Sequence, residues 1–365
     1  MKITTLTVVP LRVPYLCEIG APFSSTENLG AAVVLLRTNE GLVGENLLLA
    51  VNGKRLSVLV EMVRSMEPLI VGRDPLMAGA FLQEAQNDTR HFGFSGLAMI
   101  GIGAIDGALL DLRAKMAGLP VHKLLGCVRE CLPAYYSGAL WLHVGIDDLQ
   151  KTAVRIIERG YWGMKLRVGP GTPESRIARV KAVREAIGFN PKLLIDANQR
   201  LDEEQALALG RSLEPYDIHW LEEPVDARDH AAEARLTAAL DVKIASGETA
   251  FSYDEFKIML ENRCADILMP DVQRVGGPTE FLRIAALAAS HNVRVSGHTA
   301  PEMTLSLMAC LTNGDCLEVM PWSSPLYAEQ VQIRDGFAMT AGRAGWGHSL
   351  DRGAMRRYAL EELDF

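Results

Sequence analysis

An alternation of strand-like and helix-like segments is the feature that most constrains the fold of this chain. From about residue 133 onward, short apolar runs alternate with amphipathic stretches, with a spacing of about 25 residues. The eight runs are Pro133–Leu140, Gly163–Val168, Lys192–Asp196, Ile218–Glu222, Val242–Gly247, Ile267–Pro270, Val293–Gly297 and Cys316–Val319. Eight strands that alternate with helices predict a (β/α)8-type barrel, with parallel strands inside and helices around them.

The segments on either side of these runs have a different pattern. Near the N-terminus we expect strands at Met1–Pro10, Ala31–Thr38 and Leu42–Ala50, followed by helices at Arg55–Pro68, Asp74–Arg90 and Ser95–Ala117. Residues 321–365 are irregular and contain several prolines and glycines. The sequence therefore predicts an α/β protein in three parts. Residues 1–128 form an α+β capping domain, residues 129–320 form the barrel, and residues 321–365 return to the capping domain.

Composition and charge exclude several classes of protein. The 37 Lys and Arg against 45 Asp and Glu give a net charge of −8 without any basic run, which argues against a nucleic-acid partner. No apolar stretch reaches the ~20 residues of a membrane helix, and the N-terminus lacks the apolar core of a signal peptide. The six cysteines have neither CxxC nor zinc-site spacing. We expect a cytoplasmic protein with reduced thiols, neither bound to nor embedded in a membrane.

Three acidic residues stand at matching positions in the repeat. Asp196 and Glu222 end their apolar runs, Glu248 directly follows the next run, and successive members of this set lie 26 residues apart. The carboxyl ends of consecutive barrel strands meet at one rim, which is where barrel enzymes place their active sites. Three carboxylates that converge there would repel one another unless a cation lay between them. Because carboxylate oxygens suit a hard divalent cation, the sequence predicts a Mg²⁺ site at this rim.

Basic and hydrogen-bonding groups stand at other strand ends. Lys165 and Arg167 end the second strand and, as alternate residues, point to the same side. His298 ends the seventh strand and Asp271 the sixth, so that Asp271 can accept a hydrogen bond from the imidazole and raise its basicity. Glu318 ends the eighth strand. The predicted metal is therefore flanked by Lys165 and Arg167 on one side and by His298 and Asp271 on the other.

These motifs resemble those of the enolase superfamily, in particular its mandelate racemase subgroup. The segment from Ile102 to Lys115, followed by Leu124-Leu125-Gly126, resembles the first signature region of that family, and the strand-end residues match over nearly the whole chain. The resemblance implies a capped barrel enzyme that removes the proton next to a carboxylate through an enediolate. It also implies a small-molecule carboxylate as the substrate and a homo-oligomer, because the family is commonly oligomeric.

The same resemblance implies a role for each site residue. Asp196, Glu222 and Glu248 would bind Mg²⁺, His298 with Asp271 would act as a general base, and Glu318 would hydrogen-bond the developing enolate. Lys165 and Arg167 would hold the substrate carboxylate. Specificity would come from the loop at Glu18–Asn28 and the loop around Asn52. The expected substrate contacts are Lys165, Arg167, Asn198, Glu318, Ser24 and Asn52.

Arg167 departs from the subgroup pattern, which usually has a second lysine that acts as a base at this position. A guanidinium is almost always protonated and is a poor base. A racemase needs a base on each face of the α-carbon, whereas a dehydratase can use one. We therefore predict dehydration of a sugar acid to a 2-keto-3-deoxy acid. A racemase or epimerase is the alternative if Lys165 serves as the second base.

Two further functions are less favoured by the sequence. A muconate-type cycloisomerase would carry Lys-x-Lys on the second strand and a lysine base after the sixth, where this chain has Asp271-Val-Gln-Arg274. A non-catalytic barrel would be expected to lose metal-ligating and His–Asp residues, and both sets are intact.

Overall fold

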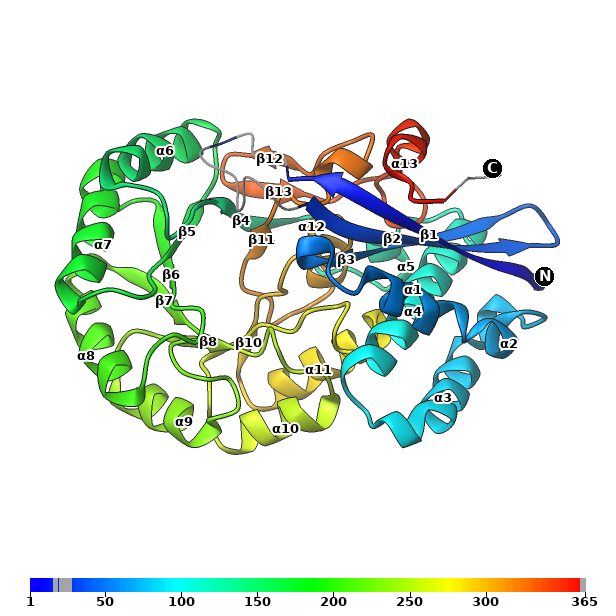
Figure 1. Ribbon diagram of the computed structural model, residues 1–365, viewed down its shortest axis with the longest axis horizontal. Helices are drawn as coiled ribbons and strands as arrows, with labels where there is room; N and C mark the ends of the chain where they lie inside the picture. The colour runs from blue at the N-terminus through cyan, green and yellow to red at the C-terminus, as the bar shows by residue number, and fades with distance from the viewer. Residues whose placement is uncertain (16–18, 20–27, 362–365) are drawn as a thin grey trace.

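The computed structural model describes residues 1–15, 19 and 28–361, and of Asn52 only the backbone. Near the N-terminus, three antiparallel strands form a sheet in the order β1 (Ile3–Pro14), β2 (Asn28–Thr38) and β3 (Val43–Ala50). Figure 1 shows this sheet beside the barrel, with β3 as the edge strand nearer the barrel interior. The expected capping region thus contains the three predicted strands.

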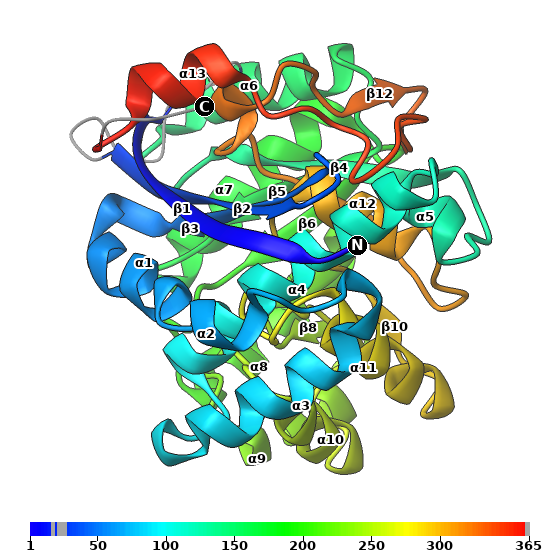
Figure 2. The same cartoon turned by 90° about the vertical axis from the view of Figure 1, so that its right-hand side faces the viewer.

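Strand β2 is apolar along its length because both faces of its sheet are covered. One face, which includes Val34 and Leu36, packs against helices α1 (Leu56–Arg64), α3 (Ala78–Thr89) and α4 (Gly96–Met116). The opposite face, which includes Val33, packs against Leu326 and Met355 from the C-terminal segment. Figure 2 shows the helices and the C-terminal segment on the two sides of this sheet.

The prediction of one continuous helix over Arg55–Pro68 was wrong in one respect. The helix α1 ends at Arg64, and a separate short helix, α2, covers Glu67–Ile70. Pro68 stands in the first turn of α2. Because proline has no backbone N–H, the hydrogen bonds of α1 cannot continue through residue 68. The first turn of a new helix tolerates proline, since its N–H groups have no partner within the helix.

The barrel predicted from the apolar runs is confirmed. Its eight strands are β4 (Cys131–Leu140), β5 (Gly163–Arg167), β6 (Lys192–Asp196), β7 (Ile218–Glu222), β8 (Ile244–Ser246), β9 (Ile267–Leu268), β10 (Arg294–Val295) and β11 (Leu317–Val319). Neighbouring strands are parallel from β4 to β10, β11 pairs with β4, and a bridge from Val295 to Gly314 closes the ring. The parallel order and the closure are those of a (β/α)8-type barrel.

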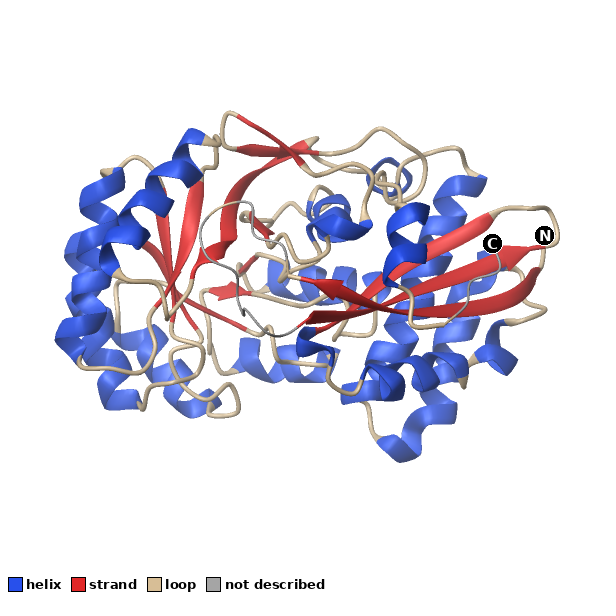
Figure 3. Cartoon of the chain, turned by 45° about the horizontal axis from the view of Figure 1, so that its top comes forward, coloured by secondary structure: helices blue, strands red, loops and turns tan. Residues whose placement is uncertain are grey.

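Helices surround the strands, as Figures 1 and 3 show. They are α6 (Ile146–Glu158), α7 (Pro173–Ile187), α8 (Glu203–Leu213), α9 (His230–Ala239), α10 (Tyr253–Glu261), α11 (Pro278–Ser290) and α12 (Pro301–Met308), and a short α5 (Val121–Leu124) precedes the barrel. Inside the strands, a layer of apolar side chains fills the barrel: Tyr135, Leu194, Trp220, Ala245, Ile267, Met269 and Cys316. They come from β4, β6, β7, β8 and β9 and from positions next to β9 and β11, and they fill the barrel beneath the carboxyl ends of its strands.

The C-terminal segment contacts both the barrel and the N-terminal sheet. A hairpin of β12 (Gln332–Arg334) and β13 (Phe337–Met339) pairs with the start of β4. Beyond it, α13 (Arg352–Tyr358) packs beside β1, and the amide of Leu360 donates a hydrogen bond to the carbonyl of Pro10. Leu326 and Tyr327, which precede the hairpin, also pack against the N-terminal sheet, so the segment contacts the cap both before and after the hairpin.

Helix α4 forms the seam between the cap and the barrel. A Cβ atom on Gly103 would lie 2.5 Å from the amide nitrogen of Gly277, so this contact requires glycine. Asp106 accepts hydrogen bonds from the amide (2.8 Å) and hydroxyl (3.0 Å) of Thr279, at the start of α11. Although α4 has 21 residues, no helix in the described part of the chain is both long and apolar enough to cross a membrane.

Candidate active site

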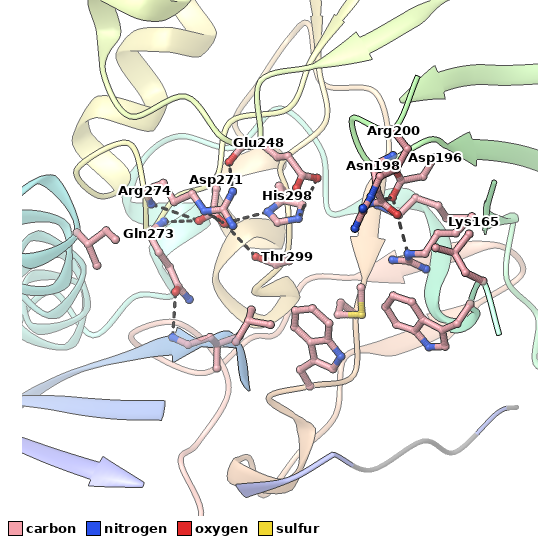
Figure 4. A pocket seen from close by; sticks show the side chains of 18 of the residues that line it. Lys165, Asp196, Asn198, Arg200, Glu248, Asp271, Gln273, Arg274, His298 and Thr299 are labelled. Atoms are coloured by element: carbon pink, nitrogen blue, oxygen red, sulfur yellow. Dashed lines mark hydrogen bonds and ion pairs between the residues drawn. The ribbon is translucent and has the colours of Figure 1, made fainter. Parts of the chain in front are cut away.

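A cavity of about 530 Å³ lies at the carboxyl ends of the barrel strands, beside the edge of the cap. Seven of the predicted site residues line it: Lys165, Arg167, Asp196, Asn198, Glu248, Asp271 and His298. Figure 4 shows His298 and Asp271 on one side of this cavity and Lys165, Asp196 and Asn198 on the other. Glu222 and Glu318 are fully buried in the adjoining wall. The structure thus brings together the strand-end residues singled out in the sequence.

The ammonium group of Lys165 lies among three carboxylates. Its Nζ is 2.7 Å from Glu222, 2.9 Å from Glu318 and 3.6 Å from Asp196. Burial by itself lowers the pKa of Lys165, but the charges of these carboxylates outweigh burial and raise it above its ordinary value. Glu318 also accepts a hydrogen bond from the amide of Thr299 at 2.8 Å. In this arrangement Glu318 is an acceptor that holds Lys165 in place.

Two of the three expected metal ligands, Asp196 and Glu222, are buried carboxyl groups with raised pKa values. Burial also acts to raise the pKa of Glu248, but His298 and Lys165 outweigh burial and lower it. Burial raises the pKa of Glu222 well above its usual value. Lys165 opposes this shift, while the like charges of Asp196 and Glu248 add to it. The indole of Trp220 donates a hydrogen bond to Glu222 at 3.0 Å. Mutual repulsion of buried carboxylates is the condition that a hard divalent cation relieves, so this donor set fits Mg²⁺.

Asn198 fixes the orientation of Asp196. Its backbone amide and its side-chain Nδ2 donate hydrogen bonds to the two carboxylate oxygens of Asp196, at 2.8 and 3.0 Å. Asn198 adopts a left-handed conformation with φ +47°, which asparagine tolerates better than most residues. The left-handed conformation of Asn198 therefore orients the carboxylate of Asp196 at a small cost in backbone strain.

His298 is held between carboxylates on both sides of its ring. Its Nδ1 lies 2.9 Å from Asp271, while Nε2 lies 3.2 Å from Glu248 and 4.0 Å from Glu318. Burial lowers the pKa of His298, but Glu248, the hydrogen bond to Asp271 and Glu318 outweigh burial and raise it to about 9. A cation bound at Glu248 would offset part of this charge and favour the neutral, basic imidazole.

Arg167 is fixed by its neighbours. Its guanidinium donates to the carbonyl (2.7 Å) and hydroxyl (3.1 Å) of Ser137 on β4. It also stacks on the ring of Trp141, with Cζ 3.6 Å from the ring centroid, and its Nε lies 3.8 Å from Asp196. The side chain is therefore a stationary positive charge in the cavity wall.

A second group of metal-ligating side chains lies away from this cavity. Among the described residues, the ligand atoms of His219, Asp315 and Cys316 lie within 4.8 Å of one another. The carboxylate oxygens of Asp196, Glu222 and Glu248 do not meet this distance criterion as a set. His219, Asp315 and Cys316 lie toward the amino ends of β7 and β11. Asp315 pairs there with His219 at 3.1 Å and with Arg294 at 3.0 Å. Its charge is already compensated, so this group needs no cation.

Several cavity residues did not emerge from the sequence. Trp141, Trp322, Gln273 and Arg274 line the cavity, and the two indole rings lie parallel with centroids 6.3 Å apart. Trp141 directly follows β4, so the strand-end rule applied to the first barrel strand would have found it. The other three lie in loops, where the sequence carries no comparable positional signal.

The capping-loop predictions fall mainly outside the described part. Ser24 lies outside the described residues, as does most of the loop at Glu18–Asn28. The side chain of Asn52 is also not described, although its neighbour Val51 lines the cavity together with Leu49. Strand β3 and the turn after it therefore supply part of the cavity wall.

Fold and site together define a capped (β/α)8-barrel enzyme. The chain belongs to the mandelate racemase/muconate lactonizing enzyme family of the enolase superfamily. The N-terminal domain model of that family matches residues 3–126, and the enolase C-terminal domain-like model matches residues 148–354. These matches confirm the resemblance inferred from the strand-end residues.

Relatives of this chain include enzymes that act on sugar acids. It is 41% identical to an L-talarate/galactarate dehydratase from Salmonella typhimurium, over 72% of this chain and 66% of that protein. It is 28% identical to a 3,6-anhydro-α-L-galactonate cycloisomerase from Streptomyces coelicolor, over 90% and 91%. A crystal structure of the Salmonella dehydratase with Mg and L-lyxarohydroxamate superposes with a TM-score of 0.92, at 32% identity, over 99% of this chain and 93% of that one.

Proposed function

We propose that this enzyme catalyses the Mg²⁺-dependent dehydration of a sugar acid to a 2-keto-3-deoxy acid. The observation that carries the proposal is the asymmetry of the cavity. A hydrogen-bonded His298–Asp271 pair faces it from one side, and two cations engaged by neighbouring groups, Lys165 and Arg167, face it from the other. One base suffices for dehydration. The dehydratase among the relatives supports the same reaction class.

The residues proposed to hold Mg²⁺ are Asp196, Glu222 and Glu248. A bound Mg²⁺ supplies positive charge where the substrate carboxylate gains negative charge during proton removal. Asn198 and Trp220 contribute by fixing two of the three carboxylates through hydrogen bonds.

His298 is proposed to move the proton. Asp271 holds Nδ1, so Nε2 is the nitrogen that faces the cavity and accepts the proton from the α-carbon. The resulting imidazolium then donates this proton to the hydroxyl group that leaves from the β-carbon. The product of these two steps is an enol, which tautomerises to the 2-keto-3-deoxy acid. Hydrogen and oxygen leave the substrate together as one water molecule.

Lys165 and Arg167 are proposed to bind the substrate carboxylate from the side opposite His298. Both are buried, and both keep contact with Asp196, so they can stabilise negative charge without moving. Glu318 would contribute by positioning Lys165. Ser24, Asn52 and Asn198 remain the proposed contacts for the hydroxyl groups of the substrate.

The experiment is a screen of acid sugars with the purified protein and Mg²⁺, read out as formation of 2-keto-3-deoxy acid. We expect turnover of at least one acid, with His298→Asn as the inactive control. Interconversion of two epimers without loss of water would replace this proposal with a racemase or epimerase. Formation of an isomeric product from an anhydro acid or a lactone would identify a cycloisomerase.

We also propose a cellular location and an oligomeric state for the enzyme. We infer a cytoplasmic homo-oligomer without nucleic-acid or membrane partners. The family resemblance supports the oligomer, and the net charge of −8 without a basic run supports the absence of nucleic acid. Light scattering of the purified protein at micromolar concentration tests the oligomer, and a monomeric mass would overturn it.

A further inference from the structure

The side chain of Gln273 joins the cap to the barrel. Its Oε1 accepts a hydrogen bond from the amide of Leu49 at 2.9 Å, and its Nε2 donates to the carbonyl of Leu47 at 3.4 Å. Both partners lie on β3, which is an edge strand of the N-terminal sheet among the residues that the structure describes. The amide of Gln273 thus takes the place of one residue of a neighbouring strand. Only 8% of Gln273 is exposed, so solvent competes little for these bonds.

Gln273 also belongs to the turn that carries Asp271. Its backbone amide donates to Oδ1 of Asp271 at 2.8 Å, and Oδ2 of Asp271 lies 2.9 Å from Nδ1 of His298. A continuous series of hydrogen bonds therefore runs from Leu49 through Gln273 and Asp271 to His298. Figure 4 shows Gln273, Asp271 and His298 on the same side of the cavity.

The strand held by Gln273 is itself part of the cavity wall. Leu49 and Val51 line the cavity from the cap, opposite the barrel residues. A shift of β3 would change the shape of the cavity at that wall without touching His298, because Asp271 is held through the backbone of Gln273 and not through its side chain. The side chain of Gln273 is thus placed to set the distance between the cap wall and the reacting groups.

Helix α11, which follows this loop, makes a second contact with the cap that does not involve the cavity wall. Thr279 donates to Asp106 of α4 through both its amide and its hydroxyl. Neither Thr279 nor Asp106 lines the cavity. This pair gives a matched control, since it also links the barrel to the cap but joins α11 to α4 and not to β3.

We propose that Gln273 is a positioning residue that determines substrate selection by fixing β3, with Leu49 and Val51, relative to His298. The inference rests on the proposed function for the identity of the substrate class. Loss of the Gln273 side-chain bonds should loosen the wall that confines the substrate and leave the proton-transfer groups in place. Substrate binding and discrimination should therefore suffer more than the chemical step.

The test compares Gln273→Met, of similar size, with Thr279→Val and the wild-type protein. We expect Gln273→Met to raise KM about tenfold, with kcat changed less than about twofold, and to reduce the discrimination between acid sugars of different length. Thr279→Val should leave both constants and the discrimination near wild type. Gln273→Asn, whose side chain is one methylene shorter, should give a smaller change of the same kind. It replaces Gln273→Met as the test variant if the methionine variant does not fold.

Two readouts do not depend on turnover. Hydrogen exchange at the amide of Leu49 should accelerate in Gln273→Met and not in Thr279→Val. Binding of L-lyxarohydroxamate with Mg²⁺ should weaken in the same variant alone. Unchanged exchange at Leu49, or unchanged KM, discrimination and hydroxamate binding, would overturn the inference.

The two proposals can fail separately. If the wild-type protein binds the hydroxamate but dehydrates no acid sugar, the proposed function fails, while weaker hydroxamate binding by Gln273→Met still supports the inference. If the wild-type protein dehydrates an acid sugar and Gln273→Met behaves like Thr279→Val, only the inference fails. A wild-type protein that neither binds the hydroxamate nor turns over any acid sugar overturns both.

Discussion

The guanidinium of Arg167 stacks on the indole of Trp141, with Cζ 3.6 Å from the ring centroid. Stacking and the two hydrogen bonds to Ser137 hold this cation at the position where the family resemblance leads us to expect a lysine base. A guanidinium stays protonated, and this one is held by the Trp141 ring and by Ser137. In the proposed mechanism, His298 is therefore the group that removes the proton. The stereochemistry of the reaction follows from this contact.

We predict that the enzyme exchanges the α-proton of only one configuration. In D₂O, recovered substrate of the opposite α-configuration should carry no deuterium, because Lys165, whose pKa is raised, and Arg167 should both stay protonated on that side. Arg167→Lys should introduce slow exchange there, since a lysine amine cannot make both Ser137 bonds and the Trp141 stack at once. Deuterium in both epimers with the wild-type protein, measured by NMR, would show that Lys165 acts as a second base.

Removal of divalent cations should abolish turnover, and Mg²⁺ should restore it. The indole of Trp220 donates to Glu222, a proposed ligand, so Mg²⁺ should also change the tryptophan fluorescence. Trp220→Phe should lose most of this change, which separates it from the signals of the other tryptophans. Full activity in excess chelator, or a fluorescence titration that Glu222→Gln leaves unaltered, would contradict the metal assignment.

His298→Asn should lower kcat by about 10²–10⁴-fold, because loss of a general base typically costs that much. Asp271→Asn should lower it less, since the imidazole is then misoriented and not deleted. His291→Asn, at the exposed end of α11, is the matched control and should have no effect. Steady-state rates on the identified acid sugar decide the matter, and a His298→Asn enzyme of normal rate would refute the assignment.

Much of the fold and of the site was predictable because both follow from periodicity. The barrel repeats one strand–helix unit, and residues that end consecutive strands, such as Asp196 and Glu222, must meet at one rim. The contact of Gln273 with Leu49 could not be predicted, because the two residues are 224 positions apart and meet only once the cap has docked on the barrel. The orientation of Arg167 toward Trp141 likewise depends on packing between β4 and β5.

Glu302, a buried residue outside the active-site cavity, should make the free energy of unfolding depend on pH. Glu302 is 3% exposed and accepts a hydrogen bond from the hydroxyl of Ser323 at 2.9 Å. Burial raises its pKa to about 7, although hydrogen bonds from its own backbone amide and from Ser323 act in the opposite direction. In the unfolded chain this carboxyl titrates near 4.5.

Between pH 4.5 and 7 the folded protein therefore keeps a proton on Glu302 that the unfolded chain has lost, so the free energy of unfolding falls as pH rises through this window. The loss should be complete above pH 7 and amount to roughly 3 kcal/mol, at ~1.4 kcal/mol per pKa unit. Glu302→Gln keeps an acceptor for Ser323 but cannot ionise, so it should flatten the profile and be the more stable protein at pH 8. Asp106 and Glu233, whose pKa values are also raised, will leave part of the slope in place. Denaturant unfolding of both proteins from pH 4 to 8 measures the difference, and parallel profiles would show that Glu302 is ionised in the folded protein throughout.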